Sequence, residues 1–125
     1  MEMHKYRKRL FEKVLDSNIK IILPEITDAR IVSAADKMKK IGFNIIALND
    51  FSDNCTLYKE SLSNKNFTKN WTEKMIDEYL QNSLVQGLLM LDNNIADCLV
   101  AGAATSTADV IKSSIRIVGV KNKWV

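Results

Sequence analysis

Three consecutive hydroxyl side chains lie at the start of a helix that the sequence predicts near the end of the chain. Thr105, Ser106 and Thr107 follow an apolar strand and a stretch of small residues that includes Gly102. Hydroxyl groups and the unpaired N–H groups of a helix start suit a phosphate or another anion. In open α/β sheets, ligands bind where strands end and helices begin. The segment is thus a candidate anion site, although the same residue types also cap helices that bind nothing, and the sequence favours neither interpretation.

A second cluster of chemically useful side chains follows Pro24, the single proline of the chain. Glu25, Asp28 and Arg30 come after an apolar strand and lead into the next predicted helix. They are placed either to contact a ligand or to form a helix cap with an ion pair that fixes the turn. The second interpretation is favoured, because an acidic residue at a helix start is stabilising without any ligand. If both strands belong to one sheet, this loop and the hydroxyl-bearing loop border a shared crevice.

Two basic side chains lie on the helix that follows the hydroxyl residues. Lys112 is about one turn into this helix and faces the same end of the sheet, where its charge can neutralise a phosphate or a carboxylate. Arg116 is one turn further along the same face, since residues four apart are neighbours on a helix. If the segment binds an anion and does not merely cap the helix, the expected substrate-binding residues are Gly102, Thr105, Ser106, Thr107 and Lys112.

Other catalytic arrangements find little support in the sequence. His4 is the single histidine and lies near the start of the chain, far from any acid or nucleophile cluster, so a catalytic triad is not expected. Cys55 and Cys98 form neither a metal-type spacing nor a disulfide framework, and Cys98 is expected to be a small buried hydrophobe. No secretory signal or membrane-spanning run is recognised, and a reducing cytoplasm is the expected location.

The composition is that of one globular domain. The chain has 125 residues, of which 46% are hydrophobic and 26% charged, which allows a substantial core. The net charge of +3 is mild, and much of the positive excess lies at residues 4–9, where a solvated helix face is favoured over a nucleic-acid-binding arm. We find no nucleic-acid-binding motif and no glycine-rich nucleotide fingerprint. Nucleic acid and membranes are therefore not expected partners.

The order of predicted elements indicates an α/β fold. Residues 19–23 are rich in β-branched side chains and predict a strand. Thr27 or Asp28 can cap the next helix, which would run to about residue 41 and stop at Gly42. A second strand over residues 43–48 then completes a strand–helix–strand unit, which is typical of a parallel sheet.

The remaining elements continue this pattern. Further helices are predicted over residues 2–17, 73–81, 83–91 and 105–118, and a third strand over residues 96–101. Gly87 lies inside one of these helices and costs stability unless something packs closely against it. Residues 50–70 are polar without a clear period, and we expect a surface excursion with one short helix around residues 55–62.

Three stretches of the sequence resemble the phosphate acetyl/butyryltransferase family, which includes phosphate acetyltransferase (phosphotransacetylase). They are Ile21-Ile-Leu-Pro-Glu-Ile-Thr-Asp-Ala-Arg30 with Ala34, Ala35 and Gly42 after it, residues 82–91 with Gly87, and Ala96-Asp-Cys-Leu-Val-Ala-Gly-Ala-Ala-Thr-Ser-Thr-Ala-Asp109. The third stretch is the most specific. The similarity covers nearly the whole chain, is weakest over residues 50–70, and corresponds to the N-terminal portion of family members.

The resemblance implies a fold and a reaction. The fold would be a three-layer α/β/α sandwich with a mainly parallel sheet, corresponding to the first domain of a two-domain protein with its active site between the domains. The reaction would transfer an acyl group between acetyl-CoA and inorganic phosphate, giving acetyl phosphate and CoA. Neither a metal nor an organic cofactor is implied, since CoA enters as a substrate. A base would deprotonate the CoA thiol, while cations and N–H donors would hold phosphate and the developing oxyanion.

The chain departs from the family pattern in ways that bear on activity. The second domain, which carries the Ser-Arg and Asp residues that the family uses in catalysis, is expected to be missing from residues 1–125, so no catalytic residue is assigned. Lys112 stands where the family has an arginine, and lysine keeps the charge but loses the bidentate fork. A second family arginine has no counterpart near Lys65, Ser113 replaces a proline, and Cys98 stands where glycine is common. Residues 121–125 drift from the family's continuation, as a frameshift or an early stop would produce.

The resulting expectation is a single truncated domain over residues 1–125. It is either an acyltransferase half that is inactive alone, or a catalytically dead remnant acting as a binding or structural protein. A phosphate butyryltransferase-like half is a further alternative. Acetyl-CoA and phosphate are its partners only if a complementing chain exists. The surface that would face the missing domain should expose apolar side chains, which favours a homo-oligomer.

Overall fold

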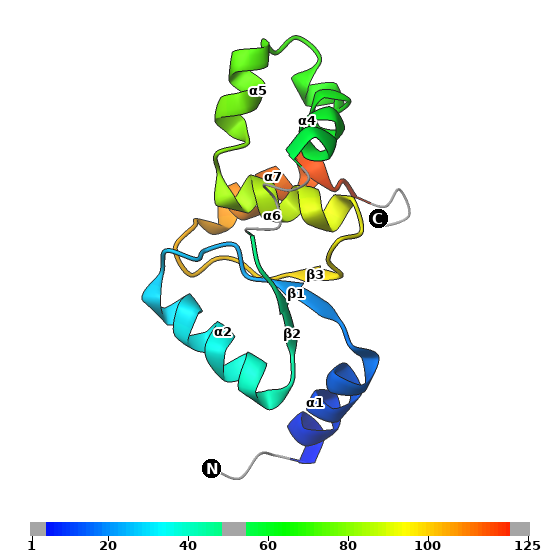
Figure 1. The fold of residues 1–125 in the computed structure, drawn as a ribbon, viewed down its shortest axis with the longest axis vertical. Coiled ribbons are helices and arrows are strands. Elements are labelled where there is room, and N and C mark those ends of the chain that lie inside the picture. Colours follow the sequence, from blue (N-terminus) through cyan, green and yellow to red (C-terminus); the bar gives the residue numbers. More distant parts are fainter. Residues whose placement is uncertain (1–4, 49–54, 121–125) are drawn as a thin grey trace.

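The computed structural model describes residues 5–48 and 55–120 (Figure 1). The helices in this part of the chain are α1 (Lys5–Ser17), α2 (Ala29–Ile41), α4 (Cys55–Ser63), α5 (Glu73–Tyr79), α6 (Ser83–Asp92) and α7 (Thr107–Ile117), with a short 3₁₀ helix, η1, over Asn66–Thr68. The strands are β1 (Lys20–Ile22), β2 (Asn44–Ile46) and β3 (Cys98–Leu99). Three predicted segments lie outside the described residues. They are the helix start at residues 2–4, the loop at residues 49 and 50, and the tail at residues 121–125.

The three strands form one parallel sheet in the order β2-β1-β3. In the central strand, Ile21 is paired with Ile45 on one side and with Cys98 on the other. Helix α2 lies on one side of the sheet, and α6 and α7 lie on the other (Figure 1). The predicted α/β fold with helices on both faces of a parallel sheet is thereby confirmed.

Several helix ends follow from local signals that the sequence displays. Asp28 is the N-cap of α2, and its Oδ1 accepts the N–H of Arg30 at 2.9 Å. Gly42 ends the same helix with φ = 118°, in the left-handed region that favours glycine. Thr72 caps α5, where its Oγ1 accepts the N–H of Met75 at 3.3 Å. These caps confirm the predicted positions of α2 and α5.

The third strand is shorter than predicted. The apolar pattern predicts a strand over residues 96–101, whereas β3 covers only Cys98–Leu99, and Cys98 is half-buried rather than fully buried. The N–H of Val100 still donates to the carbonyl of Ile22 at 3.1 Å. Just after this point, the N–H groups of Gly102 and Ala103 bind the carboxylate of Glu25.

The segment of residues 55–68 contributes buried side chains to the core, although many of its residues are exposed. Tyr58 and Leu62 lie one turn apart on α4, and both are fully buried in the main hydrophobic cluster. Thr68 is also buried, and its hydroxyl donates to the carbonyl of Leu62 at 2.6 Å. The short predicted helix is confirmed as α4. Most of the segment lies at the surface as expected, but three of its side chains are buried, which the prediction did not include.

The centre of the core is α6, which lies against the sheet. Its buried residues are Leu84, Val85, Gly87, Leu88, Leu89 and Met90. A Cβ added to Gly87 would lie 2.9 Å from Cδ1 of Leu99 and 3.3 Å from Cβ of Pro24. The expected close packing at Gly87 is therefore confirmed, and it sets the distance between this helix and the strand ends.

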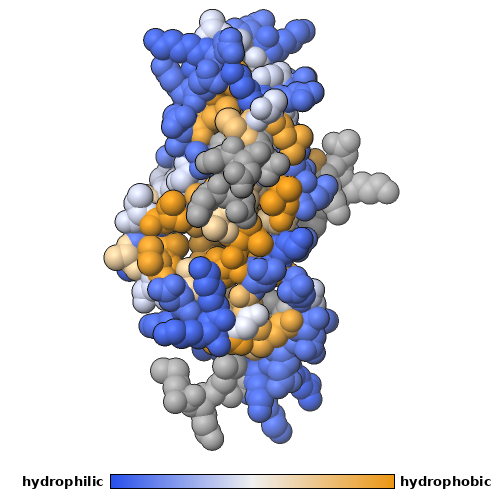
Figure 2. All heavy atoms as spheres, viewed as in Figure 1, coloured by the Kyte–Doolittle hydropathy of each residue, from blue (hydrophilic) through white to orange (hydrophobic). Residues whose placement is uncertain are grey.

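Hydrophobic side chains also reach the surface. On the face drawn in Figure 2 they gather around the middle of the molecule, while both ends are mainly hydrophilic. Val100, Ile111 and Ile115 are each more than half exposed, at 54%, 53% and 53%. Exposed apolar surface is thus present, as expected, while the homo-oligomer itself stays a prediction. No helix in the described ranges is long and apolar enough to cross a lipid bilayer.

Candidate functional site

The loops that follow β1 and β3 meet at the carboxyl end of the sheet, as the sequence predicts. Glu25 extends from the first loop into the second and is 5% exposed. Its Oε1 accepts the N–H groups of Gly102 at 2.7 Å and Ala103 at 2.9 Å. Its Oε2 accepts the N–H groups of Ala104 and of Thr105, the latter at 2.7 Å. Four consecutive main-chain donors therefore surround one carboxylate.

This arrangement holds Glu25 in its charged form. Burial by itself raises the pKa of the carboxyl group, but the four N–H bonds outweigh that effect and lower the pKa from 4.5 to about 2. A concave run of main-chain N–H groups is an anion-binding nest. Here the anion is the chain's own carboxylate, which stays ionised at neutral pH.

Asp28 and Arg30 form a second link between the two loops. Arg30 binds both carboxylate oxygens of Asp28, with Nε to Oδ1 at 3.1 Å and Nη2 to Oδ2 at 2.7 Å. The same Nη2 donates to the carbonyl of Ala103 at 2.8 Å. The hydrogen bonds from Arg30 lower the pKa of Asp28 to about 2, and Asp28 raises the pKa of Arg30. The interpretation of these residues as a helix cap with an ion pair is confirmed.

Two of the predicted binding residues, Gly102 and Thr105, donate their main-chain N–H groups to the carboxylate of Glu25. Gly102 adopts φ = 122°, a conformation that glycine allows and that other residues rarely reach. The side chain of Thr105 is partly exposed beside this turn. A substrate anion at this loop therefore has to use side chains, because these main-chain donors already have a partner.

Ser106, Thr107 and Lys112 lie on the start and first turns of α7. The hydroxyl of Ser106 caps the helix by accepting the N–H of Asp109 at 3.2 Å. Thr107 and Lys112 are exposed. The helix start and its position beside the β1–α2 loop are as predicted, while the contact of these side chains with a substrate stays a prediction.

Helical spacing places Arg116 on the same face as Lys112, but in the structure its guanidinium group lies over an aromatic ring. Its guanidinium carbon lies 5.6 Å from the centre of the Phe67 ring, a cation–π contact. Phe67 in turn packs edge-on against Trp71 and Tyr79, with ring centres 5.4 and 6.0 Å apart. Arg116 therefore ties α7 to the aromatic side chains around α5 and has a structural role.

The role of Glu25 is the feature that the sequence did not reveal. Its position at the end of β1 is visible, but its partners lie on another loop, 77 to 80 residues further along the chain. One signal is available in retrospect. The run of glycine and alanine at residues 102–104 leaves the main chain unobstructed, so an acidic side chain at the end of the adjacent strand can reach several N–H groups.

The site offers hydrogen-bond donors and cations but no cluster of metal ligands. Within residues 5–48 and 55–120, no three His, Cys, Asp or Glu side chains lie close enough together to hold a metal ion. Cys55 is exposed and Cys98 is half-buried, and both are free thiols. The exposed polar groups at the start of α7 are hydroxyl and ammonium groups, and recognition of an anion by them stays a prediction.

Comparison with known proteins agrees with this geometry. A family model described as phosphate acetyl/butaryl transferase matches residues 41–124, which is most of the chain. The chain belongs to the phosphate acetyl/butyryltransferase family. A curated member, the phosphate acetyltransferase of Acetivibrio thermocellus, is 24% identical over 135 residues and matches 90% of this chain.

Two solved phosphotransacetylases share the fold. The protein from Streptococcus pyogenes superposes with a TM-score of 0.79 at 24% identity, over 98% of this chain. The EutD phosphotransacetylase from Staphylococcus aureus gives a TM-score of 0.71 at 23% identity, over 93% of this chain. This chain spans only 41% of the curated relative's length and 44% and 42% of the two solved chains. It thus corresponds to one part of the phosphotransacetylase fold.

Proposed function

We propose that this chain forms one wall of a phosphotransacetylase-type site, where acetyl-CoA and inorganic phosphate give acetyl phosphate and CoA. Family membership and the shared fold support the proposal. Because the chain spans less than half the length of its relatives, the groups that carry out acyl transfer are proposed to come from outside residues 1–125. The chain by itself is then inactive.

The observation that carries the proposal is the linkage of two loops through Glu25. It fixes the β3–α7 loop before any ligand arrives, so little conformational freedom is lost when a ligand binds. Side chains at the start of α7 are then presented outward at the carboxyl end of the sheet, where α/β proteins bind ligands. The side chains proposed to contact CoA or phosphate are those of Thr105, Ser106, Thr107 and Lys112, while Gly102 is proposed to contribute through the shape of the turn only. No metal or organic cofactor is part of the proposal.

A turnover assay that follows release of the CoA thiol from acetyl-CoA in the presence of phosphate tests this function. The chain alone should give no turnover, and adding the part of the fold that it does not span should give turnover. In that mixture, Lys112→Ala should lower kcat/KM at least tenfold, and Lys112→Arg should retain activity. Turnover by the chain alone refutes the division of the site, and activity unchanged in Lys112→Ala refutes the role of Lys112.

A binding or structural protein without catalysis is the second candidate. It is favoured by the fact that Glu25 already uses the four N–H groups that would otherwise attract an anion. The amide NMR signals of residues 102–112 separate the two candidates. Shifts on addition of CoA or phosphate support a substrate-binding wall, whereas unchanged signals support a structural role.

Replacing acetyl-CoA with butyryl-CoA in the turnover assay distinguishes a preference for acetyl groups from a preference for butyryl groups.

Two further features belong to this proposal. A cytoplasmic location is consistent with the free thiols of Cys55 and Cys98. Self-association of the isolated chain is supported by the exposed apolar side chains of Ile111 and Ile115 on α7.

A further inference from the structure

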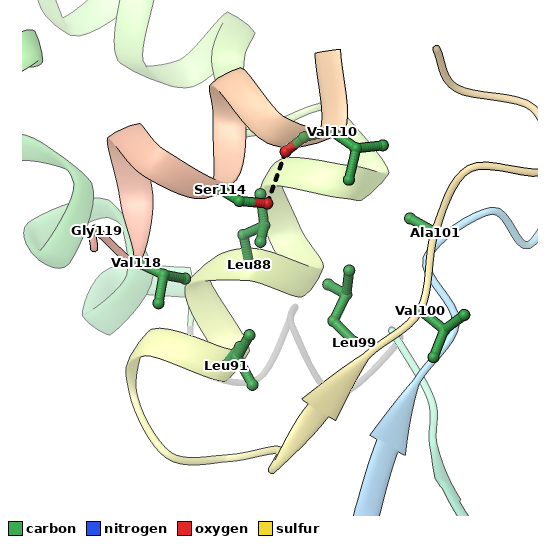
Figure 3. Close-up of a pocket in the computed structure, with 9 residues that line it drawn as sticks. All are labelled: Leu88, Leu91, Leu99, Val100, Ala101, Val110, Ser114, Val118 and Gly119. Atoms are coloured by element: carbon green, nitrogen blue, oxygen red, sulfur yellow. Dashed lines mark hydrogen bonds between the residues drawn. The ribbon is translucent and has the colours of Figure 1, made fainter. Parts of the chain in front are cut away.

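Apolar grooves lie beside both outer strands of the sheet. The groove beside β3, between α6 and α7, has a volume of about 350 Å³ (Figure 3). Ser114 is the single polar side chain that lines it. The hydroxyl of Ser114 already donates to the carbonyl of Val110 at 2.6 Å, as the dashed line in Figure 3 shows. No side chain of this groove selects one kind of partner over another.

The groove beside β2, between this strand and α2, carries charged side chains. It has a volume of about 180 Å³, and most of the residues that line it are apolar. Asp36 and Lys39 of α2 also line it. Both are exposed, and neither takes part in an ion pair within residues 5–48 and 55–120. The groove therefore presents one negative and one positive group that have no charged partner in the described part of the chain.

The same groove adjoins an outer edge of the sheet. In the strand order β2-β1-β3, β2 pairs with β1 on one side and with no other strand of the described ranges. An outer strand presents main-chain N–H and C=O groups with which a further strand can pair. Charged residues on an edge oppose such pairing, whereas the exposed residues nearest this edge, Ile26, Val32 and Ala47, are uncharged. The edge is thus open to pairing.

A second copy of the chain, related by a two-fold axis, fits this edge. With the axis beside Ile45, the β2 strands of the two copies pair antiparallel, and Asn44 of one copy lies opposite Ile46 of the other. Helix α2 connects β1 to β2 and packs against β2. If α2 lies above the middle of this strand pair, the axes of the two α2 helices are about two strand spacings apart, or roughly 10 Å. Helices pack against each other at about this distance.

The charges of the groove complement each other across the same axis. The two α2 helices run antiparallel, so Asp36 of one copy lies opposite Lys39 of the other, and the symmetry repeats this pair. Opposite charges across an interface fix the orientation of the partners more than they raise affinity. The exposed side chains of Val32 and Ala47 are covered in the same contact. The groove is therefore complementary to itself in charge and in main-chain pairing.

We propose that the chain forms a two-fold dimer through β2 and α2, in which the sheets of the two copies join into one continuous sheet. Because β3 lies on the other side of β1, the dimer leaves the groove of Figure 3 free. This surface differs from the side of α7 that carries Ile111 and Ile115. The dimer goes beyond the proposed acyltransferase function and does not depend on it.

The test is a charge exchange on α2, with sedimentation equilibrium of the full chain as the measurement. Asp36→Lys and Lys39→Asp each place like charges opposite each other and should weaken dimerisation at least fivefold. The double variant Asp36→Lys/Lys39→Asp restores opposite charges and should recover the wild-type affinity. An α7 contact does not involve these charges and does not produce this pattern.

A second pair of variants tests the apolar part of the contact. Val32→Asp should weaken dimerisation at least fivefold, because Val32 is 47% exposed in one copy and covered in the dimer. The matched control is Met75→Asp on α5, where the side chain is 44% exposed, and it should leave the affinity unchanged. Circular dichroism checks that each variant folds.

Hydrogen exchange gives a readout that belongs to the strand itself. Exchange within residues 44–46 should slow at least tenfold from dilute to concentrated protein, because the edge of β2 becomes paired. The proposal is overturned by a wild type that stays monomeric, by single charge variants that dimerise as the wild type does, or by a double variant that fails to recover. Self-association with unchanged exchange at residues 44–46 also overturns it. Each measurement is made without turnover, so failure of the proposed function leaves this inference standing.

Discussion

Replacing Glu25 with glutamine removes the charge that holds the two loops together while keeping the size of the side chain. Glutamine has one acceptor oxygen, so two of the four N–H groups that now bind the carboxylate face an amide NH₂ group instead. An unsatisfied buried donor costs about 1–3 kcal/mol. The backbone of residues 102–104 is partly open to solvent, so water reduces this cost.

The pKa of Glu25 gives a second measure of the same contact. A fall from 4.5 to about 2 corresponds to about 3 kcal/mol of stabilisation of the charged form. Solvent screening at an exposed loop lowers the realised value. We therefore expect Glu25→Gln to lower the free energy of unfolding by about 1–3 kcal/mol at pH 7, a large share of the 5–15 kcal/mol that is typical of a domain.

The pH dependence has a defined sign. In the unfolded chain Glu25 takes up a proton near pH 4.5, whereas in the folded protein it stays charged down to about pH 2. Its stabilisation is complete above pH 4.5 and is lost as the pH falls towards 2. The difference between wild type and Glu25→Gln should therefore shrink across this interval. Urea unfolding between pH 7 and pH 3, followed by the fluorescence of the half-buried Trp71 and by circular dichroism, measures it.

Phosphate provides a second readout through the shorter variant Glu25→Ala. This variant leaves all four N–H groups without a carboxylate and leaves their nest open to inorganic phosphate. Phosphate at about 50 mM, which is a large excess, should raise the urea midpoint of the variant but not that of the wild type. The reference for both proteins is sodium chloride of equal ionic strength. The exposed Glu60 gives the control Glu60→Gln. Equal stability of wild type and Glu25→Gln at pH 7, or a difference that does not change down to pH 3, would show that the carboxylate does not lock the loops.

Three other substitutions probe the packing and the surface. Gly87→Ala should destabilise the protein by about 1 kcal/mol, because overpacking against Leu99 outweighs the gain in helix propensity, and a urea midpoint above that of the wild type would contradict this. Gly102→Ala should lower the free energy of unfolding by about 1–3 kcal/mol. Backbone strain is the only cause, since an added Cβ meets nothing within 4 Å. An unchanged urea midpoint would show that the backbone at this position is not strained by alanine. Ile111→Lys/Ile115→Lys should shift the isolated chain towards monomer in sedimentation equilibrium, and a wild type that is already monomeric at micromolar concentration would contradict the expected self-association.

The features that sequence predicts well are those fixed by neighbouring residues. Asp28, Gly42 and Thr72 each act within one turn of their own helix, so residue type and position suffice to place the helix end. The parallel sheet follows from the alternation of strands and helices. Gly87 was recognised as a residue that needs a close neighbour, but the identity of that neighbour, Leu99, depends on how α6 is placed on the sheet.

The features that sequence missed depend on contacts between distant segments. The contact of Glu25 with the loop directly after β3 joins two segments that lie 77 to 80 residues apart, so the apolar pattern of the strand does not indicate it. The burial of Tyr58 and Leu62 depends on the packing of α4 against α6, which leaves no periodic signal in a short polar segment. Arg116 has the spacing of a partner for Lys112, yet the nearby ring of Phe67 determines its contact.

The charges around the two loops bear on how the proposed site would bind phosphate. Glu25 stays ionised at any physiological pH, so protonation does not free its N–H donors for a substrate anion. The charge of Arg30 is already matched by Asp28, which leaves Lys112 and the hydroxyl groups of α7 as the groups proposed to attract phosphate. Phosphate carries between one and two negative charges near neutral pH, and the like charge of Glu25 opposes its approach. In the proposed function, tight binding of phosphate therefore requires further cations from outside residues 1–125.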